Sequence, residues 1–292
     1  MSDTAPEEKR VTPANLILAV CSVAVIQLVG LLVSYQNLPV FQSIVNSTGY
    51  VNPVGGLTGG EPVESSAGNA VLLVGLAFLL TLGLVWLLRN KRVTSFKLII
   101  FASVAIASFT ITLVTADVFA FNNLPPSAEI PFSFGVASLV VVLIGYVIFV
   151  RNVLWLSTGI LAFVGAEVGS FFAESLPPLT ALVLPAAFAI YDIYAVFKGP
   201  LKMLIGTAPN VALVGMSIRA GVFTLGLGDI VFYTMLPSLA LLQAGYLAAL
   251  ATILAIDLGV VLTLFLLSRR KLLPGLPIPM LFGIVVLLFY FF

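Results

Sequence analysis

The sequence predicts an all-α polytopic membrane protein with nine transmembrane helices, and three observations carry this prediction. Hydrophobic residues make up 61% of the 292 positions and charged residues only 9%, whereas about 25% of an ordinary soluble domain is charged. The mean hydropathy is +1.19. Apolar stretches of roughly 20 residues, the length that crosses a bilayer as a helix, recur along the chain. Lipid is therefore the solvent for most of this protein.

The apolar stretches define spans joined by short loops, and we interpret residues 1–292 as a single membrane domain. We place the nine spans approximately at 14–35, 69–88, 96–116, 131–150, 153–173, 178–197, 220–242, 245–267 and 275–292. The first stretch follows Lys9 and Arg10 as a signal peptide would, but it is long for one and lacks a small-residue cleavage site. We therefore expect it to be retained as a span.

The basic residues predict the orientation, because short cytoplasmic loops accumulate lysine and arginine. All 13 of them precede span 1 or separate spans 2 and 3, 4 and 5, 6 and 7, or 8 and 9, so every one falls on the same side. One missed or invented helix would scatter them across both sides. We expect a multi-pass protein of the cell membrane with a cytoplasmic N-terminus and an extracytoplasmic C-terminus.

The composition also excludes several classes of function. With 13 Lys and Arg against 12 Asp and Glu, the chain has no basic surface for nucleic acid. It has no histidine, which excludes Ser-His and Cys-His nucleophile pairs and zinc sites of the His-Glu-x-x-His kind. The single cysteine, Cys21, cannot form an intrachain disulfide. No motif indicates a metal, nucleotide or organic cofactor, and the sequence leaves open whether the chain forms a homo-oligomer.

Acidic residues inside the predicted spans are the strongest functional signal, because an ionisable group at membrane depth costs several kcal/mol. They are Glu167, Asp192, Asp229 and Asp257. At 1.5 Å per helical residue, Asp192 lies about 9 Å from Lys198 and Asp229 about 15 Å from Arg219. Asp257 and Glu167 lie about 18 and 24 Å from the basic residue that borders their spans. We therefore expect Asp192 and Asp229 to share one depth, in the cytoplasmic half.

Two carboxyl groups on neighbouring spans can hydrolyse a peptide bond without histidine. Their mutual repulsion disfavours ionising both, so one acid activates a water while its protonated partner polarises the scissile carbonyl. A helical substrate must also be unwound, because its own hydrogen bonds occupy its backbone carbonyls. Glycines beside an aspartate permit the close backbone approach that this requires.

Three short motifs accompany these acids. Asp192 follows Tyr191, Asp229 ends Gly226-Leu227-Gly228-Asp229, and the ninth span opens with Pro274-Gly275-Leu276-Pro277. Tyr-Asp, Gly-x-Gly-Asp and Pro-x-Leu in spans 6, 7 and 9 resemble the presenilin and signal peptide peptidase family of intramembrane aspartyl proteases, and the chain is most similar to an archaeal presenilin homologue. The resemblance covers essentially the whole chain. One departure is Gly275, which stands where the family has the alanine of Pro-Ala-Leu.

The resemblance implies a catalytic pair, Asp192 and Asp229, that acts on transmembrane protein or peptide substrates within the lipid bilayer. It further implies that eight residues shape the site or bind substrate: Tyr191, Gly226, Leu227, Gly228, Pro274, Gly275, Leu276 and Pro277.

The alternative function is a proton-coupled transporter that uses Asp192, Asp229 and Asp257, because transporters also place acids in the membrane. The absence of repeated halves and the odd number of predicted spans disfavour it. We interpret Asp257 and Glu167 as packing or hydrogen-bonding residues. Glu167 lies between Gly165 and Gly169, a spacing suited to close helix packing.

Overall fold

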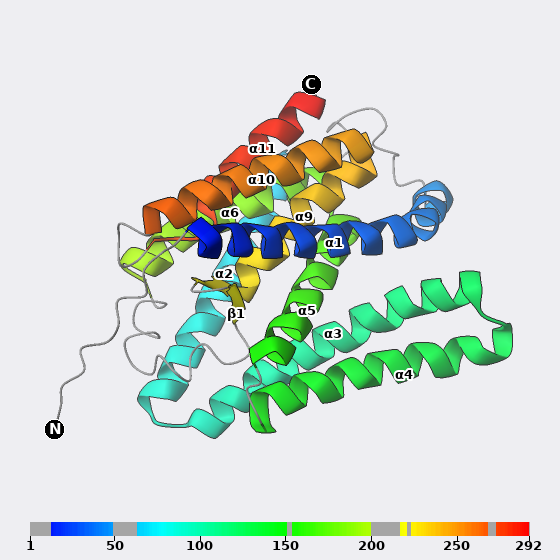
Figure 1. Ribbon diagram of the computed structural model, residues 1–292, viewed down its shortest axis with the longest axis horizontal. Helices are drawn as coiled ribbons and strands as arrows, with labels where there is room; N and C mark the ends of the chain where they lie inside the picture. The colour runs from blue at the N-terminus through cyan, green and yellow to red at the C-terminus, as the bar shows by residue number, and fades with distance from the viewer. Residues whose placement is uncertain are drawn as a thin grey trace.

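The computed structural model describes residues 13–48, 63–150, 154–199, 217–220, 223–267 and 273–291. Within these ranges the chain forms nine α-helices, one π-helical turn and a two-stranded antiparallel sheet (Figure 1). The elements are α1 (Pro13–Thr48), α2 (Val63–Arg89), α3 (Val93–Asn123), α4 (Pro126–Gly145), the π-turn η2 (Tyr146–Val150), α5 (Leu154–Ser175), α6 (Pro178–Phe197), β1 (Ser217–Ala220), β2 (Phe223–Gly226), α9 (Leu227–Ala244), α10 (Tyr246–Leu267) and α11 (Pro277–Phe291).

The helix lengths bear out the predicted helical membrane fold. Eight of the described helices are long and apolar enough to cross a membrane. The ninth, α11, has 15 residues and reaches about 22 Å at 1.5 Å per residue. That is shorter than a hydrocarbon core of roughly 30 Å, and α11 is the shortest of the nine described helices.

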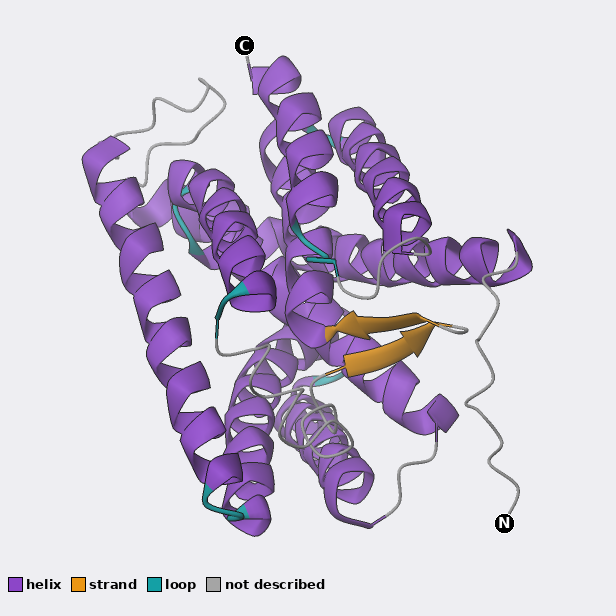
Figure 2. Cartoon of the chain, turned by 90° about the vertical axis from the view of Figure 1, so that its left-hand side faces the viewer, coloured by secondary structure: helices purple, strands orange, loops and turns teal. Residues whose placement is uncertain are grey.

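A small β-hairpin is the main departure from the predicted all-helical plan. β1 and β2 pair antiparallel, with Arg219 opposite Thr224 (Figure 2). The sequence predicts a seventh span that begins near residue 220, whereas helix α9 begins at Leu227. An apolar run such as Phe-Thr-Leu cannot be told from the first turn of a buried helix by hydropathy. As a result Asp229 lies in the first turn of α9, and its depth cannot be counted along a helix from Arg219.

Helix α9 lies at the centre of the bundle, where α5 packs closely against it. A Cβ built on Gly165 of α5 would lie 2.8 Å from Cγ2 of Ile230, and one built on Gly169 would collide with Thr234. Small residues of this kind allow close helix approach in a membrane, where van der Waals packing drives association. Nearly all residues of α9 from Ile230 to Leu241 are buried, so most of this helix lies inside the bundle.

The start of α11 is fixed by close packing against α10. A Cβ built on Gly259 would lie 2.5 Å from Cα of Pro279, so only glycine fits there without a backbone shift. Pro277 and Pro279 carry no N–H, which leaves the first turn of α11 fewer donors to satisfy than an ordinary helix start. The packing and the prolines together place the short segment before α11 beside α9 and α6.

The helix ends that border basic residues gather on one side of the molecule. In Figure 1 the start of α1, the end of α2, the start of α3 and the ends of α6 and α10 all lie toward the left and bottom. The described basic residues are Arg89, Lys91, Arg92, Lys97, Lys198 and Arg219. The other predicted cytoplasmic lysines and arginines lie outside the described residues. Which side of the membrane this is stays a prediction.

Candidate active site

Asp192 reaches from α6 to the segment that precedes α11. Its Oδ2 accepts a hydrogen bond from the backbone N–H of Leu276 at 3.1 Å. Asp192 is half-buried and Leu276 is buried. A side chain near the end of α6 is thereby joined to backbone 84 positions later in the chain.

Asp229 occupies the first turn of α9. Its Oδ2 accepts the backbone N–H of Gly226, the N-cap residue, at 3.2 Å. A carboxylate at this position satisfies an N-terminal donor and interacts favourably with the helix dipole. On its other side the carboxyl group meets Gly275, where an added Cβ would lie 2.6 Å from Oδ2 and 3.1 Å from Cγ.

The two carboxyl groups therefore converge on one short piece of backbone from two different helices. Asp192 contacts Leu276 and Asp229 contacts Gly275, its neighbour in sequence. The carbonyl of Gly275 and the N–H of Leu276 belong to one peptide unit, so both carboxyl groups border the same peptide. This arrangement, two acids beside non-helical backbone inside an apolar bundle, can hold a proton and polarise a carbonyl.

The glycines around Asp229 differ in their surroundings. A Cβ on Gly226 would lie 3.2 Å from Oδ2 of Asp229, whereas one on Gly228 would meet nothing within 4 Å. Gly228 is also exposed. Leu227 packs toward α5, with its Cδ1 3.2 Å from a Cβ built on Gly165. Open space beside Asp229 thus lies at Gly228.

The remaining predicted site residues lie in two different places. Pro274 is buried and Pro277 half-buried, on either side of the Gly275–Leu276 segment. Tyr191 is turned toward α2, where its hydroxyl donates to Oγ1 of Thr81 at 3.5 Å and its ring meets that of Phe78 at 6.4 Å. Among the described residues, no hydrogen bond joins Tyr191 to either carboxyl group.

The other two intramembrane acids are placed elsewhere. Glu167 is 1% exposed and accepts a hydrogen bond from Thr112 of α3 at 2.7 Å. Asp257 on α10 is half-buried, and its Oδ1 has no hydrogen-bond partner in the described part of the chain. Glu167 thus has a hydrogen-bond partner, whereas Oδ1 of Asp257 has none among the described residues. The described residues contain no cluster of three or more His, Cys, Asp or Glu suited to a metal ion.

One residue of the site lies outside the sequence motifs. Tyr233 of α9 donates its hydroxyl to the backbone carbonyl of Gly275 at 2.8 Å. Its spacing of four from Asp229 was the available signal, because residues i and i+4 share one face of a helix. The tyrosine lies within an almost continuously apolar span, where an aromatic residue ordinarily indicates packing.

The helices define a multi-pass membrane protein, and comparison with known sequences gives its family. The sequence matches the presenilin family over residues 11–212 and 216–292, so this chain belongs to the presenilin family. Presenilin-B of Dictyostelium discoideum is 37% identical over 126 residues, which are 40% of this chain and 26% of that protein. The matched region thus spans about a quarter of this relative.

Solved structures show the same fold. Two crystal forms of a presenilin family intramembrane aspartate protease superpose with TM-scores of 0.61 and 0.60, each at 20% sequence identity. The superpositions cover 94% and 92% of this chain and 97% and 95% of the solved chains. At this identity the likeness establishes the fold, and the chemistry has to be argued from the residues.

Proposed function

We propose that the protein is an intramembrane aspartic endopeptidase that uses Asp192 and Asp229 to cleave transmembrane helical substrates. The observation that carries this proposal is the convergence of both carboxyl groups on the Gly275–Leu276 backbone. Membership of the presenilin family supports it. The two solved neighbours are themselves described as intramembrane aspartate proteases.

The proposed reaction is general acid-base hydrolysis. One carboxylate of the pair accepts a proton from a water molecule as the water oxygen bonds to the scissile carbonyl carbon. The protonated partner donates a hydrogen bond to the carbonyl oxygen and stabilises the charge that develops there. The carbon–nitrogen bond then breaks as the amide nitrogen takes up a proton, which leaves a carboxyl end and an amine end.

The hairpin offers an edge for an unwound substrate. The N–H of Arg219 donates to Oγ1 of Thr158 on α5 at 3.4 Å, so it points away from β2. In an antiparallel ladder the residue opposite, Thr224, then also points its N–H away from its partner strand. Gly226 lies two residues after Thr224 on β2, so its N–H also points away from β1. This N–H donates to Oδ2 of Asp229. A substrate strand that paired with this outer edge of β2 would run past Asp229.

The proposal places cleavage in the cytoplasmic half of the bilayer. Asp192 lies near the end of α6 that leads to Lys198, and Asp229 lies at the start of α9, just after the hairpin that carries Arg219. Both are near helix ends that border basic residues, and such loops face the cytoplasm. Cleavage products should therefore separate near the cytoplasmic boundary, with the N-terminus of the enzyme on the same side.

The decisive test is cleavage of a labelled single-span substrate by the purified protein in liposomes. Asp192→Asn and Asp229→Asn keep the side-chain shape but remove the acid, so each should lower kcat by roughly 10²–10⁴-fold, the contribution of general acid-base catalysis. Asp257→Asn is the matched control, the same change on the next helix, and should retain parental activity. Activity that survives in either of the first two variants would overturn the assignment of the pair.

The same liposomes distinguish the proposed protease from a proton-coupled transporter. Proton uptake by a parent protein that cleaves nothing, abolished by Asp257→Asn, would replace the protease with a carrier. Fragments that map only to the outer half of the substrate would leave the pair in place but overturn the proposed depth.

A further inference from the structure

A single buried hydroxyl connects the helix that carries Asp229 to the backbone that contacts Asp192. We infer that Tyr233 is a positioning residue, whose hydroxyl holds the Gly275–Leu276 peptide in place between the two carboxyl groups. This inference rests on the proposed protease function. Tyr233 touches neither acid through a hydrogen bond and acts through the backbone it holds.

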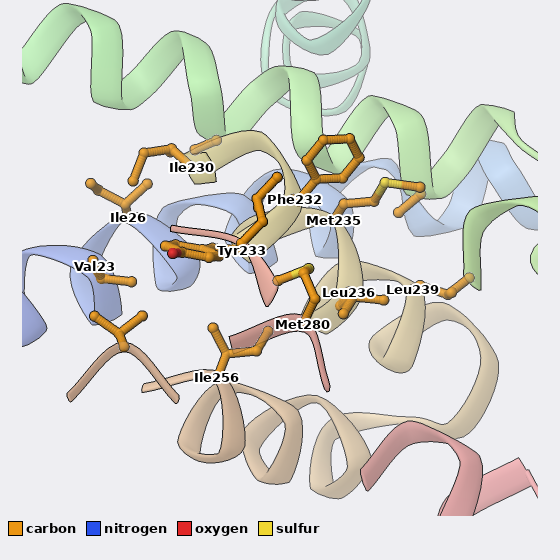
Figure 3. Packing of buried hydrophobic residues seen from close by; sticks show 14 of the residues in the cluster. Val23, Ile26, Ile230, Phe232, Tyr233, Met235, Leu236, Leu239, Ile256 and Met280 are labelled. Carbon is orange, nitrogen blue, oxygen red and sulfur yellow. The ribbon is translucent and has the colours of Figure 1, made fainter. Parts of the chain in front are cut away.

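Tyr233 is buried, and its hydroxyl meets the carbonyl of Gly275 inside the bundle. The residue is 2% exposed, and its ring lies in the apolar core with Val23, Ile26 and Met280 (Figure 3). A phenol in such a place is costly unless its hydroxyl is hydrogen-bonded. In the described part of the chain its hydrogen-bond partner is the carbonyl of Gly275.

The two hydrogen bonds on this segment hold a single peptide unit from opposite ends. The carbonyl of Gly275 and the N–H of Leu276 belong to the same planar group, and in a trans peptide they point in opposite directions. Tyr233 holds the carbonyl and Asp192 accepts the N–H. Rotation of the peptide would therefore break both hydrogen bonds at once.

Helix α9 relates the position of this peptide to that of Asp229. Asp229 and Tyr233 are one turn apart on this helix, so they keep a fixed spacing on the same face. Asp229 lies against Cα of Gly275 while Tyr233 holds the carbonyl of the same residue. The hydroxyl thereby fixes the peptide relative to Asp229, and the peptide in turn directs its N–H to Asp192.

Tyr233→Phe removes one oxygen and leaves the ring in the core, which makes it the sharpest test. We expect kcat for a labelled single-span substrate to fall at least about 10-fold, because small misplacements of catalytic groups cost rate steeply. The change in KM should be smaller than the change in kcat, since the hydroxyl faces the protein's own backbone. Tyr146→Phe, on the partly exposed π-turn, is the matched control and should behave as the parent.

A second control separates positioning from loss of packing. Leu239→Val removes one methylene from a fully buried residue farther along α9, so it should lower the midpoint of thermal unfolding while kcat stays at the parental value. An equal fall of kcat in Leu239→Val and Tyr233→Phe would overturn the inference. So would a Tyr233→Phe variant with parental kcat, or one that changes KM alone.

Hydrogen exchange of the Leu276 amide gives a readout that needs no activity. In Tyr233→Phe the released peptide should exchange at least about 10 times faster than in the parent, because local opening exposes its N–H to solvent, whereas Tyr146→Phe should leave the rate unchanged. An unchanged rate in Tyr233→Phe overturns the inference. A parent that fails to cleave refutes the proposed protease, and the exchange rate still decides whether Tyr233 holds the segment.

Discussion

Gly275 is where this chain departs from the Pro-Ala-Leu pattern of the family that it resembles, and the structure gives the departure a physical consequence. A methyl group there would lie 2.6 Å from Oδ2 of Asp229 and 3.3 Å from Oδ1. The carboxyl group that would have to move is held on its other side by the N–H of Gly226. The missing methyl thus lets the backbone lie directly against Asp229.

Gly275→Ala, which restores the family residue, should therefore reduce activity in this protein. We expect kcat to fall roughly 10-fold, because the methyl pushes the Asp229 carboxyl group out of place. Thermal stability should change little, since the atom that must move is the end of a side chain. Gly159→Ala, at an exposed helical glycine with open space around it, is the control. Parental or higher activity in Gly275→Ala would show that Asp229 adjusts without cost.

At the scale of elements, the hairpin offers a test of the proposed substrate edge. Thr224 is exposed, and its N–H points away from β1, so it does not contribute to the ladder between the strands. Proline lacks this donor and is tolerated at edge positions whose N–H is not used by the sheet. Thr224→Pro should keep the hairpin and remove one donor from the outer edge of β2.

We expect Thr224→Pro to raise KM several-fold for a single-span substrate, because the unwound substrate loses a backbone partner. Thr224→Val keeps the N–H and should match the parent, which separates the donor from the side chain. Steady-state kinetics in detergent measures both. If Thr224→Pro has the parental KM, the substrate does not pair with β2 at this position.

The hairpin and Tyr233 also mark the limit of prediction from sequence. Span length and hydropathy predict the number of helices, because each helix buries its backbone within itself and needs only enough apolar residues. The motif residues could be read because their spacing is local. The hairpin is not predicted because a run as short as Phe223-Thr224-Leu225 cannot be told from the start of the following helix by hydropathy. The contact between Tyr233 and Gly275 joins positions 42 apart, and hydropathy carries no information on such a contact.

At the scale of the whole molecule, the one-sided distribution of basic residues predicts which face is cytoplasmic. Asn123 ends α3 and Arg92 precedes it, so the two positions lie at opposite ends of one long helix. Both residues are exposed. Because Arg92 belongs to the most basic of the predicted loops, the positive-inside rule assigns it to the cytoplasm and Asn123 to the outside.

Single cysteines at these two positions test that assignment once Cys21, which is exposed on α1, is replaced by serine. On intact cells a membrane-impermeant thiol reagent should label Asn123→Cys at once and Arg92→Cys only after the membrane is opened. The reverse pattern would mean that the protein has the opposite orientation. Asp192 and Asp229 would then lie in the outer half of the bilayer, and cleavage products would separate outside. Labelling of both from outside would mean that α3 does not span the membrane, although its length and hydropathy suffice. The expected pattern would place the start of α9, and with it the proposed cleavage, on the cytoplasmic side.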